Sequence, residues 1–343
     1  MEPIREIGSE FWDIPISEND NGLFPADTRW FVSGTSALEY IVKDIINCRP
    51  VTTVGIPSWC CSCMIEPFLK YGIQVRLYPV YYAEDGKLVC SFSDIIADCW
   101  LVMSYFGYSS LVSIGCPNGV IIRDLTHSIF SEIVEDGDYY FGSLRKWAGF
   151  YTGGFAWCKR RWNIDLEIPK VEIEYVSLRK KAMKHKKEYL ADLSIQRDYL
   201  NEFNEAERML ESYGVMGGYE NDEERARHLD IQLMTSTRRN NASILVHQLK
   251  DLVVFPVLDP QDCPMFVPIL VPQSIRTSLR QFLIDQKIYC PIHWPISSLH
   301  RLDQKTMRVY LEEISLICDQ RYNELDMYRI VDAVKAYLSF SLA

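Results

Sequence analysis

Apolar residues occur along this chain in short blocks, some with helical spacing and others in the continuous runs of a buried strand. Residues 34–46 have helical spacing, and residues 51–56 form an apolar run that predicts a strand. A second helical pattern over residues 62–71 stops at Gly72, and residues 73–80 predict another strand. This alternation predicts an α/β fold, with a mostly parallel sheet covered by helices on both faces.

More strands are predicted before the middle of the chain. They are short apolar runs at residues 99–106, 119–123, 139–141 and 154–158. Ligands of open α/β sheets bind at the carboxyl ends of the strands. The residues that follow each predicted strand are therefore the first candidates for a functional site.

The pattern changes along the chain in a way that predicts an arm and two domains. Residues 1–24 predict an extended N-terminal arm, and residues 25–245 a large domain with a charged, helical last part. Residues 246–343 predict a smaller C-terminal α+β domain. Its first strands are expected at residues 252–258 and 265–271.

An acid and a lysine follow two successive predicted strands. Asp124 comes directly after residues 119–123, and Lys146 follows residues 139–141 at a distance of 146 − 124 = 22 residues from the acid. Pyridoxal 5'-phosphate (PLP) chemistry needs this pair: a lysine for the Schiff base and an acid for the pyridine nitrogen. The two strand ends therefore predict a PLP site.

These residues resemble the DegT-type (DegT/StrS) aminotransferases, which are PLP-dependent enzymes of fold type I. In that family a strand-end Asp is followed three residues later by Gln or His, and then by Ser-x-x-Lys. Asp124, His127, Ser143 and Lys146 match this spacing, and SGTSAL at residues 33–38 resembles the first family motif. Two further matches lie near the end of the chain, at His293-Trp294-Pro295 and at residues 315–322.

The resemblance implies catalytic roles for two of the matched residues. Lys146 would form the Schiff base and move the proton, and Asp124 would keep the pyridine nitrogen protonated. His127 would contact the phenolic oxygen of the cofactor or pack beside its ring.

The cofactor phosphate is expected at the start of the first helix. Free backbone N–H groups and the helix dipole favour an anion there, so Gly34 and Thr35 are predicted phosphate ligands, with Ser36 as a further candidate. The resemblance adds Ser143 from the Ser-x-x-Lys motif.

Other residues are predicted to contact the cofactor ring or the substrate. Trp59 follows a predicted strand where the family places an aromatic residue that stacks on the cofactor, although a shift in register would put Cys60 or Cys61 there. Tyr105 and His293 are candidates for the substrate pocket, and each is also typical of a buried strand end.

The resemblance implies an aminotransferase that takes an amino group from glutamate or glutamine and passes it to a nucleotide-linked keto sugar. A lysine at position 146 disfavours the related dehydratases, which have a histidine there. The resemblance also implies a homodimer with each site at the subunit interface. The chain departs from the family in its short N-terminal part and in residues 57–63. Either departure could reshape the acceptor pocket so that it admits a substrate other than a sugar nucleotide.

Two alternatives belong to other classes of protein. One is a PLP-binding sensor or scaffold without turnover. The other is a thiol redox protein that uses Cys60 and Cys63, because the segment WCCSC at residues 59–63 contains W-C-x-x-C between a predicted strand and a helix. No second cysteine pair has zinc-ligand spacing, so no metal site is predicted.

Composition indicates which partners and which cellular compartment to expect. The net charge of −10 over 343 residues argues against nucleic-acid binding. No run of 18 apolar residues and no basic-then-apolar leader occurs, so we expect a cytoplasmic protein without membrane segments. The eleven cysteines are then expected to be reduced thiols.

Overall fold

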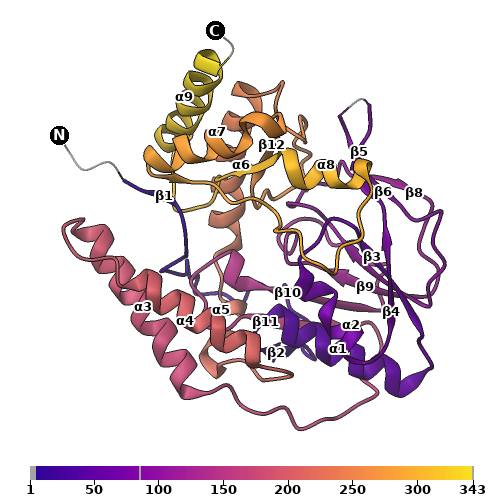
Figure 1. Ribbon diagram of the computed structural model, residues 1–343. Coiled ribbons are helices and arrows are strands. Elements are labelled where there is room, and N and C mark those ends of the chain that lie inside the picture. The colour runs from indigo at the N-terminus through magenta and orange to yellow at the C-terminus, as the bar shows by residue number, and fades with distance from the viewer. Residues whose placement is uncertain (1–4, 85, 342–343) are drawn as a thin grey trace.

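A seven-stranded sheet forms the centre of the computed structural model, which describes residues 5–84 and 86–341 (Figure 1). The strand order is β2-β11-β10-β9-β7-β3-β4, and β11 runs opposite to the other six strands. The carboxyl ends of those six strands therefore lie at one edge of the sheet. The strands are β2 (Arg29–Phe31), β3 (Thr53–Pro57), β4 (Gln74–Tyr78), β7 (Cys99–Met103), β9 (Val120–Asp124), β10 (Tyr139–Ser143) and β11 (Gly154–Cys158).

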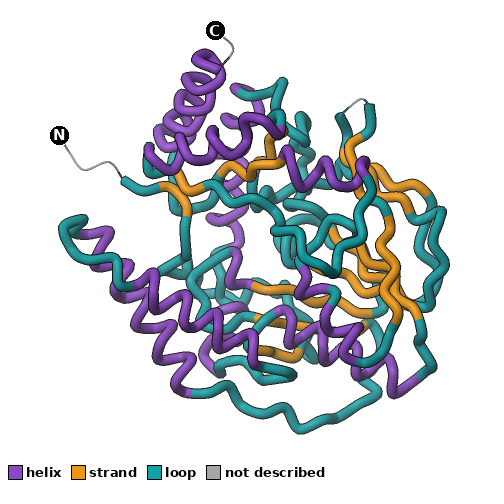
Figure 2. The backbone as a smooth tube through the Cα atoms, in the orientation of Figure 1, coloured by secondary structure: helices purple, strands orange, loops and turns teal. Residues whose placement is uncertain are grey.

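Helices lie beside and above this sheet and form much of the C-terminal part of the chain, whereas strands and loops occupy the right side of the view (Figure 2). Figure 1 shows α3 and α4 as a neighbouring pair at one side, and α7 and α9 above the sheet. The helices are α1 (Gly34–Cys48), α2 (Glu66–Lys70), α3 (Ile173–Ala191), α4 (Tyr199–Ser212), α5 (Glu220–Arg227), α6 (Ile231–Gln248), α7 (Gln273–Asp285), α8 (Gln304–Glu312) and α9 (Glu324–Ser341).

Three small sheets complete the architecture. They pair β1 (Ile7–Gly8) with β13 (Ile288–Tyr289), β12 (Val267–Leu270) with β14 (Glu313–Leu316), and β5 (Val80–Tyr82) with β6 (Leu88–Ser91) and β8 (Val112–Ile114). The β1–β13 pair ties the N-terminal segment to the C-terminal part. Ile7 is fully buried in a second hydrophobic core, which is otherwise formed by residues from α6 onward. Residues 1–4 of the predicted arm lie outside the described residues.

The predicted α/β class and the mostly parallel sheet are confirmed. Three local predictions are wrong, and each involves a proline. Residues 62–71 form a 3-10 turn (Ser62–Met64) and then α2, because Pro67 has no N–H for a continuous helix. Residues 73–80 divide into β4 and β5 around Pro79, and residues 252–258 contain Pro256 and make only one isolated bridge, from Val253 to Ile269.

Helix α1 shows how local sequence positions a functional element. Its N-cap Ser33 is extended and its hydroxyl accepts from the Ser36 N–H, which starts the helix at Gly34. Its apolar side packs on β10 and β11. A Cβ on Gly154 of β11 would lie 2.2 Å from the Ser33 carbonyl oxygen, so only glycine allows β11 to approach the start of α1.

Candidate active site

The carboxyl ends of β9 and β10 lie side by side, because Phe141 pairs with Asp124 in the parallel ladder. Ser143 ends β10, and Lys146 ends the 3-10 turn (Leu144–Lys146) that follows it. A Cβ built on Gly34 would lie 3.4 Å from the Ser143 Cβ, so the start of α1 adjoins the same edge. The structure thus brings Gly34 to the same edge of the sheet as Asp124, Ser143 and Lys146.

Lys146 has an exposed side chain at this edge of the sheet. Within residues 5–84 and 86–341 its amino group makes no hydrogen bond or ion pair. It lines a pocket of about 480 Å³ together with the N-terminal residues 9–11 and residues 289–294. The amine is therefore free to react with a group bound in this pocket.

Asp124 is a buried carboxylate with few hydrogen bonds to offset the loss of water around it. It is 4 % exposed, and its Oδ1 accepts from the Thr126 N–H at 2.7 Å. Burial raises the pKa of Asp124, while the bonds to Thr126 and the charge of Lys146 oppose that rise. A buried carboxylate of this kind fits a cationic ligand group such as a protonated ring nitrogen.

His127 is fully buried, and neither of its ring nitrogens has a hydrogen-bond partner among the described residues. Burial lowers its pKa well below the ordinary value, with further contributions from Lys146 and His293, so the imidazole is neutral. Its ring stacks on Trp294 at 5.5 Å between centroids. An unpaired buried imidazole next to Asp124 indicates a missing polar partner at this position.

The predicted phosphate ligands differ in what their side chains do. The Ser143 hydroxyl has no partner among the described residues, and Gly34 and Thr35 begin a 15-residue helix whose first N–H groups have no acceptor within the helix. The structure does not support Ser36 as a phosphate ligand. Its hydroxyl lies within hydrogen-bond distance of the Gly214 and Met216 carbonyls, at 3.0 and 3.1 Å, and accepts from the Met216 N–H at 2.8 Å. The Ser36 N–H donates to the Ser33 hydroxyl. Ser36 supports the fold around α1 and has no group left for a phosphate.

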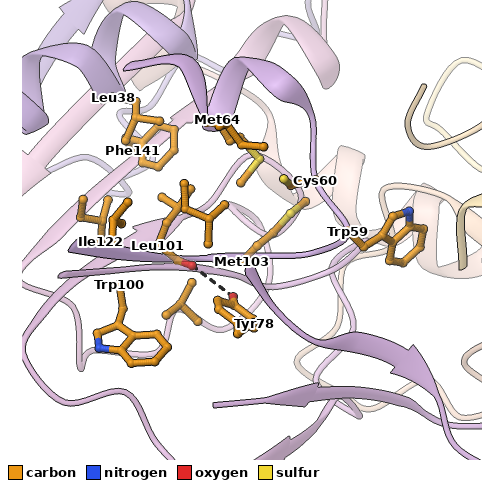
Figure 3. Close-up of a cluster of buried hydrophobic side chains, with 14 of the residues drawn as sticks. Leu38, Trp59, Cys60, Met64, Tyr78, Trp100, Leu101, Met103, Ile122 and Phe141 are labelled. Atoms are coloured by element: carbon orange, nitrogen blue, oxygen red, sulfur yellow. Dashed lines mark hydrogen bonds between the residues drawn. The ribbon is translucent and has the colours of Figure 1, made fainter. Parts of the chain in front are cut away.

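Trp59 is also a correction, because its ring lies in the aromatic core. It is fully buried, stacks on Tyr105 at 5.0 Å and donates from Nε1 to the His293 carbonyl at 2.6 Å. Figure 3 shows the Trp59 ring pointing away from the cluster around Leu101. The pocket beside Lys146 is not lined by Trp59.

The two predicted substrate residues separate in the structure. Tyr105 is fully buried and donates to the Trp59 carbonyl at 2.6 Å, so it belongs to the core. His293 lines the pocket with Lys146, and its Nδ1 lies 2.9 Å from the Ser315 hydroxyl. The structure therefore keeps His293 as a substrate candidate and removes Tyr105.

The three cysteines after Trp59 differ in their relation to Lys146. The charge of Lys146 acts on Cys61 and Cys63, and it is not among the causes of the pKa shift of Cys60. The pKa of Cys61 is lowered to about 6, first by a hydrogen bond from Cys63 and also by Lys146. Cys60 is fully buried, and burial raises its thiol pKa far above the ordinary range. A buried thiol with a raised pKa is a poor nucleophile, and this disfavours the predicted redox pair of Cys60 and Cys63.

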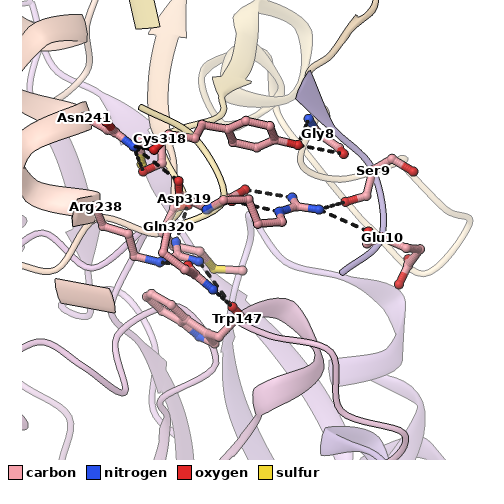
Figure 4. Close-up of polar contacts among 12 residues, drawn as sticks. Gly8, Ser9, Glu10, Trp147, Arg238, Asn241, Cys318, Asp319 and Gln320 are labelled. Atoms are coloured by element: carbon pink, nitrogen blue, oxygen red, sulfur yellow. Dashed lines mark hydrogen bonds and ion pairs between the residues drawn. The ribbon is translucent and has the colours of Figure 1, made fainter. Parts of the chain in front are cut away.

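A buried polar network supports the turn that carries Lys146, and sequence reasoning missed it (Figure 4). Arg238 of α6 is fully buried, with its guanidinium 4.4 Å from the Trp147 ring centroid. Its Nε donates to Gln320 at 2.8 Å, and Gln320 Nε2 donates to the Trp147 carbonyl at 2.7 Å. No local pattern signals these contacts, because Arg238 and Gln320 are 82 residues apart.

We expect Arg238→Met to lower the free energy of unfolding by at least about 2 kcal/mol. The carbonyls of Pro264 and Met265 would each lose the Arg238 Nη1 donor, and a buried acceptor left unpaired costs about 1–3 kcal/mol. Urea denaturation followed by tryptophan fluorescence measures the change. The matched control is Arg208→Met, at an exposed arginine without a partner among the described residues. Equal stability of the two variants would contradict the support role.

Two absences concern other kinds of site. Within the described ranges, no three His, Cys, Asp or Glu side chains are grouped to hold a metal ion. None of the helices described in residues 5–341 has the length and apolar character that a membrane crossing requires.

Comparison with solved structures assigns the fold. The chain is similar over its full length to the aminotransferase TlmJ from Streptoalloteichus hindustanus (13 % identity, all of both chains, TM-score 0.63). It is also similar to the sugar aminotransferase CalS13 from Micromonospora echinospora (14 %, 98 % and 100 % of the chains, TM-score 0.58). NtdA from Bacillus subtilis, solved with bound cofactor PMP, matches at 13 % identity over 90 % and 72 % of the chains, with a TM-score of 0.58.

The chain therefore has the fold of the fold type I aminotransferases, as predicted. No family model and no curated protein matches its sequence. At these identities the likeness establishes the fold, and the activity has to be argued from the residues of the site.

Proposed function

We propose that this protein is a PLP-dependent aminotransferase. The observation that carries the proposal is the position of Lys146, whose free amine lines a substrate-sized pocket and whose charge acts on the buried Asp124 and His127. The fold supports it, because NtdA, with the same fold, was solved with the cofactor PMP. A lysine, a buried acid and an unpaired imidazole fit the reactive carbon, ring nitrogen and phenolic oxygen of PLP.

When bound, PLP would supply an electron sink for the carbon that loses its proton. The residues of this chain would orient that group and move protons. Asp124 would hold a proton on the ring nitrogen, and the neutral His127 would contact the phenolic oxygen. Gly34, Thr35 and Ser143 would bind the phosphate. The Nζ of Lys146 would act as general base and acid at the substrate carbon.

The pocket supports an amino donor with a carboxylate, and glutamate or glutamine is the proposed donor. The lining contains more cationic than anionic side chains: Arg145, Lys146, Arg238, Arg280 and Arg321 against Glu10 and Asp319. Arg145 pairs with Glu207, and Arg321 with Asp319. Arg280 makes one hydrogen bond among the described residues, from Nε to the Cys290 carbonyl at 3.2 Å. Its two terminal amino groups remain for a carboxylate.

We expect Arg280→Ala to raise the KM for the donor about 10- to 100-fold, since a hydrogen bond to a charged group contributes about 1.5–3 kcal/mol. Steady-state kinetics with glutamate and glutamine measure the effect, and Arg280→Lys should restore part of it. Arg301→Ala, at an exposed arginine that does not line the pocket, is the control. An unchanged KM in Arg280→Ala would exclude Arg280 as the carboxylate ligand.

The proposed acceptor is a nucleotide-linked keto sugar. CalS13, which has this fold, is described as a sugar aminotransferase, and that description supports a sugar here. The homodimer and the cytoplasmic location stay predictions. Light scattering on the purified protein tests the dimer, which would cover the exposed Lys146.

The visible absorption spectrum tests the proposed function. The protein with added PLP should develop a visible band that disappears on addition of excess glutamate or glutamine. A band that persists with every amino acid would instead favour the PLP-binding protein without turnover. The absence of any band would overturn the proposal.

A further inference from the structure

His293 lines the pocket that contains Lys146, and several hydrogen bonds hold it there. Its backbone N–H donates to Glu313 Oε2 at 2.8 Å, and its carbonyl accepts from Trp59 Nε1 at 2.6 Å. Its Nδ1 lies 2.9 Å from the Ser315 hydroxyl, which is bonded in turn to Glu313 Oε1. The imidazole is thus joined to a carboxylate through one hydroxyl group.

Strand β14 places both partners of His293. Glu313 and Ser315 are two residues apart in this strand, so their side chains lie on the same face. Both are fully buried, and Glu313 has no lysine or arginine within ion-pair distance among the described residues. The partner that can carry a positive charge is His293, whose Nδ1 lies 3.7 Å from Glu313 Oε1. A buried carboxylate is costly without hydrogen bonds and an opposite charge, so Glu313 and His293 act as one unit.

These bonds determine which ring nitrogen of His293 carries a hydrogen in the neutral form. An ionised carboxylate only accepts hydrogen bonds, so the Ser315 hydroxyl donates its single hydrogen to Glu313. The Ser315 oxygen is then the acceptor toward His293, and Nδ1 has to supply the hydrogen. Nε2 is left as the nitrogen that gains and loses a proton.

Nε2 of His293 is accessible from the pocket. It has no hydrogen-bond partner within residues 5–84 and 86–341 and is not fully buried, in contrast to both ring nitrogens of His127. The rings of Phe106, Phe266 and Trp294 surround the imidazole at 5.1–5.2 Å between centroids. Packing therefore fixes the ring, with one nitrogen bonded to Ser315 and the other free for a ligand.

The other buried histidines that the structure describes lack this combination. His127 has a partner for neither nitrogen. His300 Nδ1 accepts from the Ser297 N–H at 3.1 Å, and its Nε2 lies 3.1 Å from the Cys60 carbonyl, so both of its nitrogens are occupied. Among these residues, a buried carboxylate on one side and an accessible nitrogen on the other occur together at His293.

We propose that His293 is a catalytic acid and base for the water that enters and leaves this site, and that Glu313 and Ser315 are its positioning residues. The inference rests on the proposed aminotransferase function. Release of the donor as a keto acid consumes one water molecule, and amination of the keto acceptor releases one. Each exchange requires a proton transfer at oxygen, in addition to the transfer at carbon that is assigned to Lys146.

Protons balance within each half-reaction. In the first, a C–O bond forms between water and the substrate carbon, and Nε2 of His293 accepts the proton that the water loses. That proton goes to the departing nitrogen as the C–N bond breaks. In the second, Nε2–H gives its proton to the departing oxygen as the C–O bond breaks, and Nε2 takes one from the nitrogen as the C–N bond forms. Glu313 offsets the positive charge that His293 carries between these steps.

Nitrogen NMR tests the position of the proton without any cofactor. In full-length protein labelled with 15N-histidine, the signal that is missing from His293→Asn belongs to His293. At about pH 8.5, two units above the ordinary histidine pKa, we expect a proton on Nδ1 in the wild type. In Glu313→Gln the amide can donate to Ser315, whose hydroxyl then donates to Nδ1, so Nδ1 should lose its proton. A wild-type Nδ1 without a proton, or an unchanged Nδ1 in Glu313→Gln, would overturn the positioning role.

Rapid kinetics separate the proton at oxygen from the proton at carbon. With PLP and glutamate, the visible band of His293→Asn should disappear at the wild-type rate, because Lys146 is unchanged. Release of the keto acid, followed by a coupled assay, should slow by about 10²-fold or more, as for a positioned acid–base group. Glu313→Gln should slow this release by about tenfold or more at an unchanged KM for glutamate. The matched control is His247→Asn, at an exposed histidine of α6, which should behave as the wild type.

The two proposals fail in different ways. Wild-type release of the keto acid in His293→Asn, or equal slowing of band loss and release, would overturn the role of His293 at water. A protein that never binds PLP would contradict the proposed function. In that case the NMR signals of the wild type and Glu313→Gln would still decide whether Glu313 and Ser315 set the proton on His293.

Discussion

Lys146→Ala should abolish transamination and the visible band that PLP develops with the wild type. We expect a loss of about 10³-fold or more, because a positioned acid–base group contributes about 10²–10⁴-fold. Activity with glutamate and the visible spectrum measure the two effects. The fold should be unaffected, because the exposed Lys146 side chain has no partner among the described residues.

The matched control is Lys187→Ala, at an exposed lysine of α3. Both variants should unfold within about 0.5 kcal/mol of the wild type, as is usual for exposed substitutions. A Lys146→Ala variant that retains the visible band would remove Lys146 from the proposed site. Loss of the band in the Lys187 variant as well would mean that the signal does not come from Lys146.

Asp124→Asn should reduce activity by about 10²-fold or more without lowering stability. The carboxylate would hold the proton on the ring nitrogen, and a neutral amide cannot stabilise that cation. Asn keeps an oxygen to accept the Thr126 N–H, so the local hydrogen bond survives. Activity and thermal unfolding of the same preparation separate the two effects.

The pH dependence of stability gives this substitution a second measurement. Burial raises the pKa of Asp124 in the folded protein, so the ionised carboxylate is favoured in the unfolded chain. Its cost is absent below the unfolded pKa of about 3.9 and grows as the pH rises above that value. We expect Asp124→Asn to be more stable than the wild type at pH 7, with the difference disappearing near pH 4. A less stable variant at pH 7 would contradict this electrostatic account.

Short patterns located the main parts of the proposed site. The apolar runs that end at Asp124 and before Lys146 predict adjacent parallel strands, and the structure pairs β9 with β10. The helical spacing over residues 34–46 likewise predicts the helix that starts at Gly34 in the structure. These predictions hold because strand and helix periods are local properties, and parallel strands bring their carboxyl ends to one edge.

The residues after β3 could not be assigned by the same means. Trp59, Cys60 and Cys61 are consecutive in an irregular segment, and their burial differs: Trp59 and Cys60 are buried, whereas Cys61 is half-buried. Trp59 packs in the core against Tyr105, whereas Cys61 lies near Lys146. This choice depends on which distant side chains fill the core, and no repeating period encodes it.

The sequence by itself determined the α/β class, the order of most strands and helices, and the acid and lysine at neighbouring strand ends. The tertiary structure decided which thiol lies beside Lys146, and it turned Ser36 and Tyr105 into supports of the fold. It also assembled Arg238 and Gln320 around Trp147 from segments far apart in the chain. The physical reason is that backbone periodicity is set by near neighbours, whereas side-chain direction and burial are set by packing between remote segments.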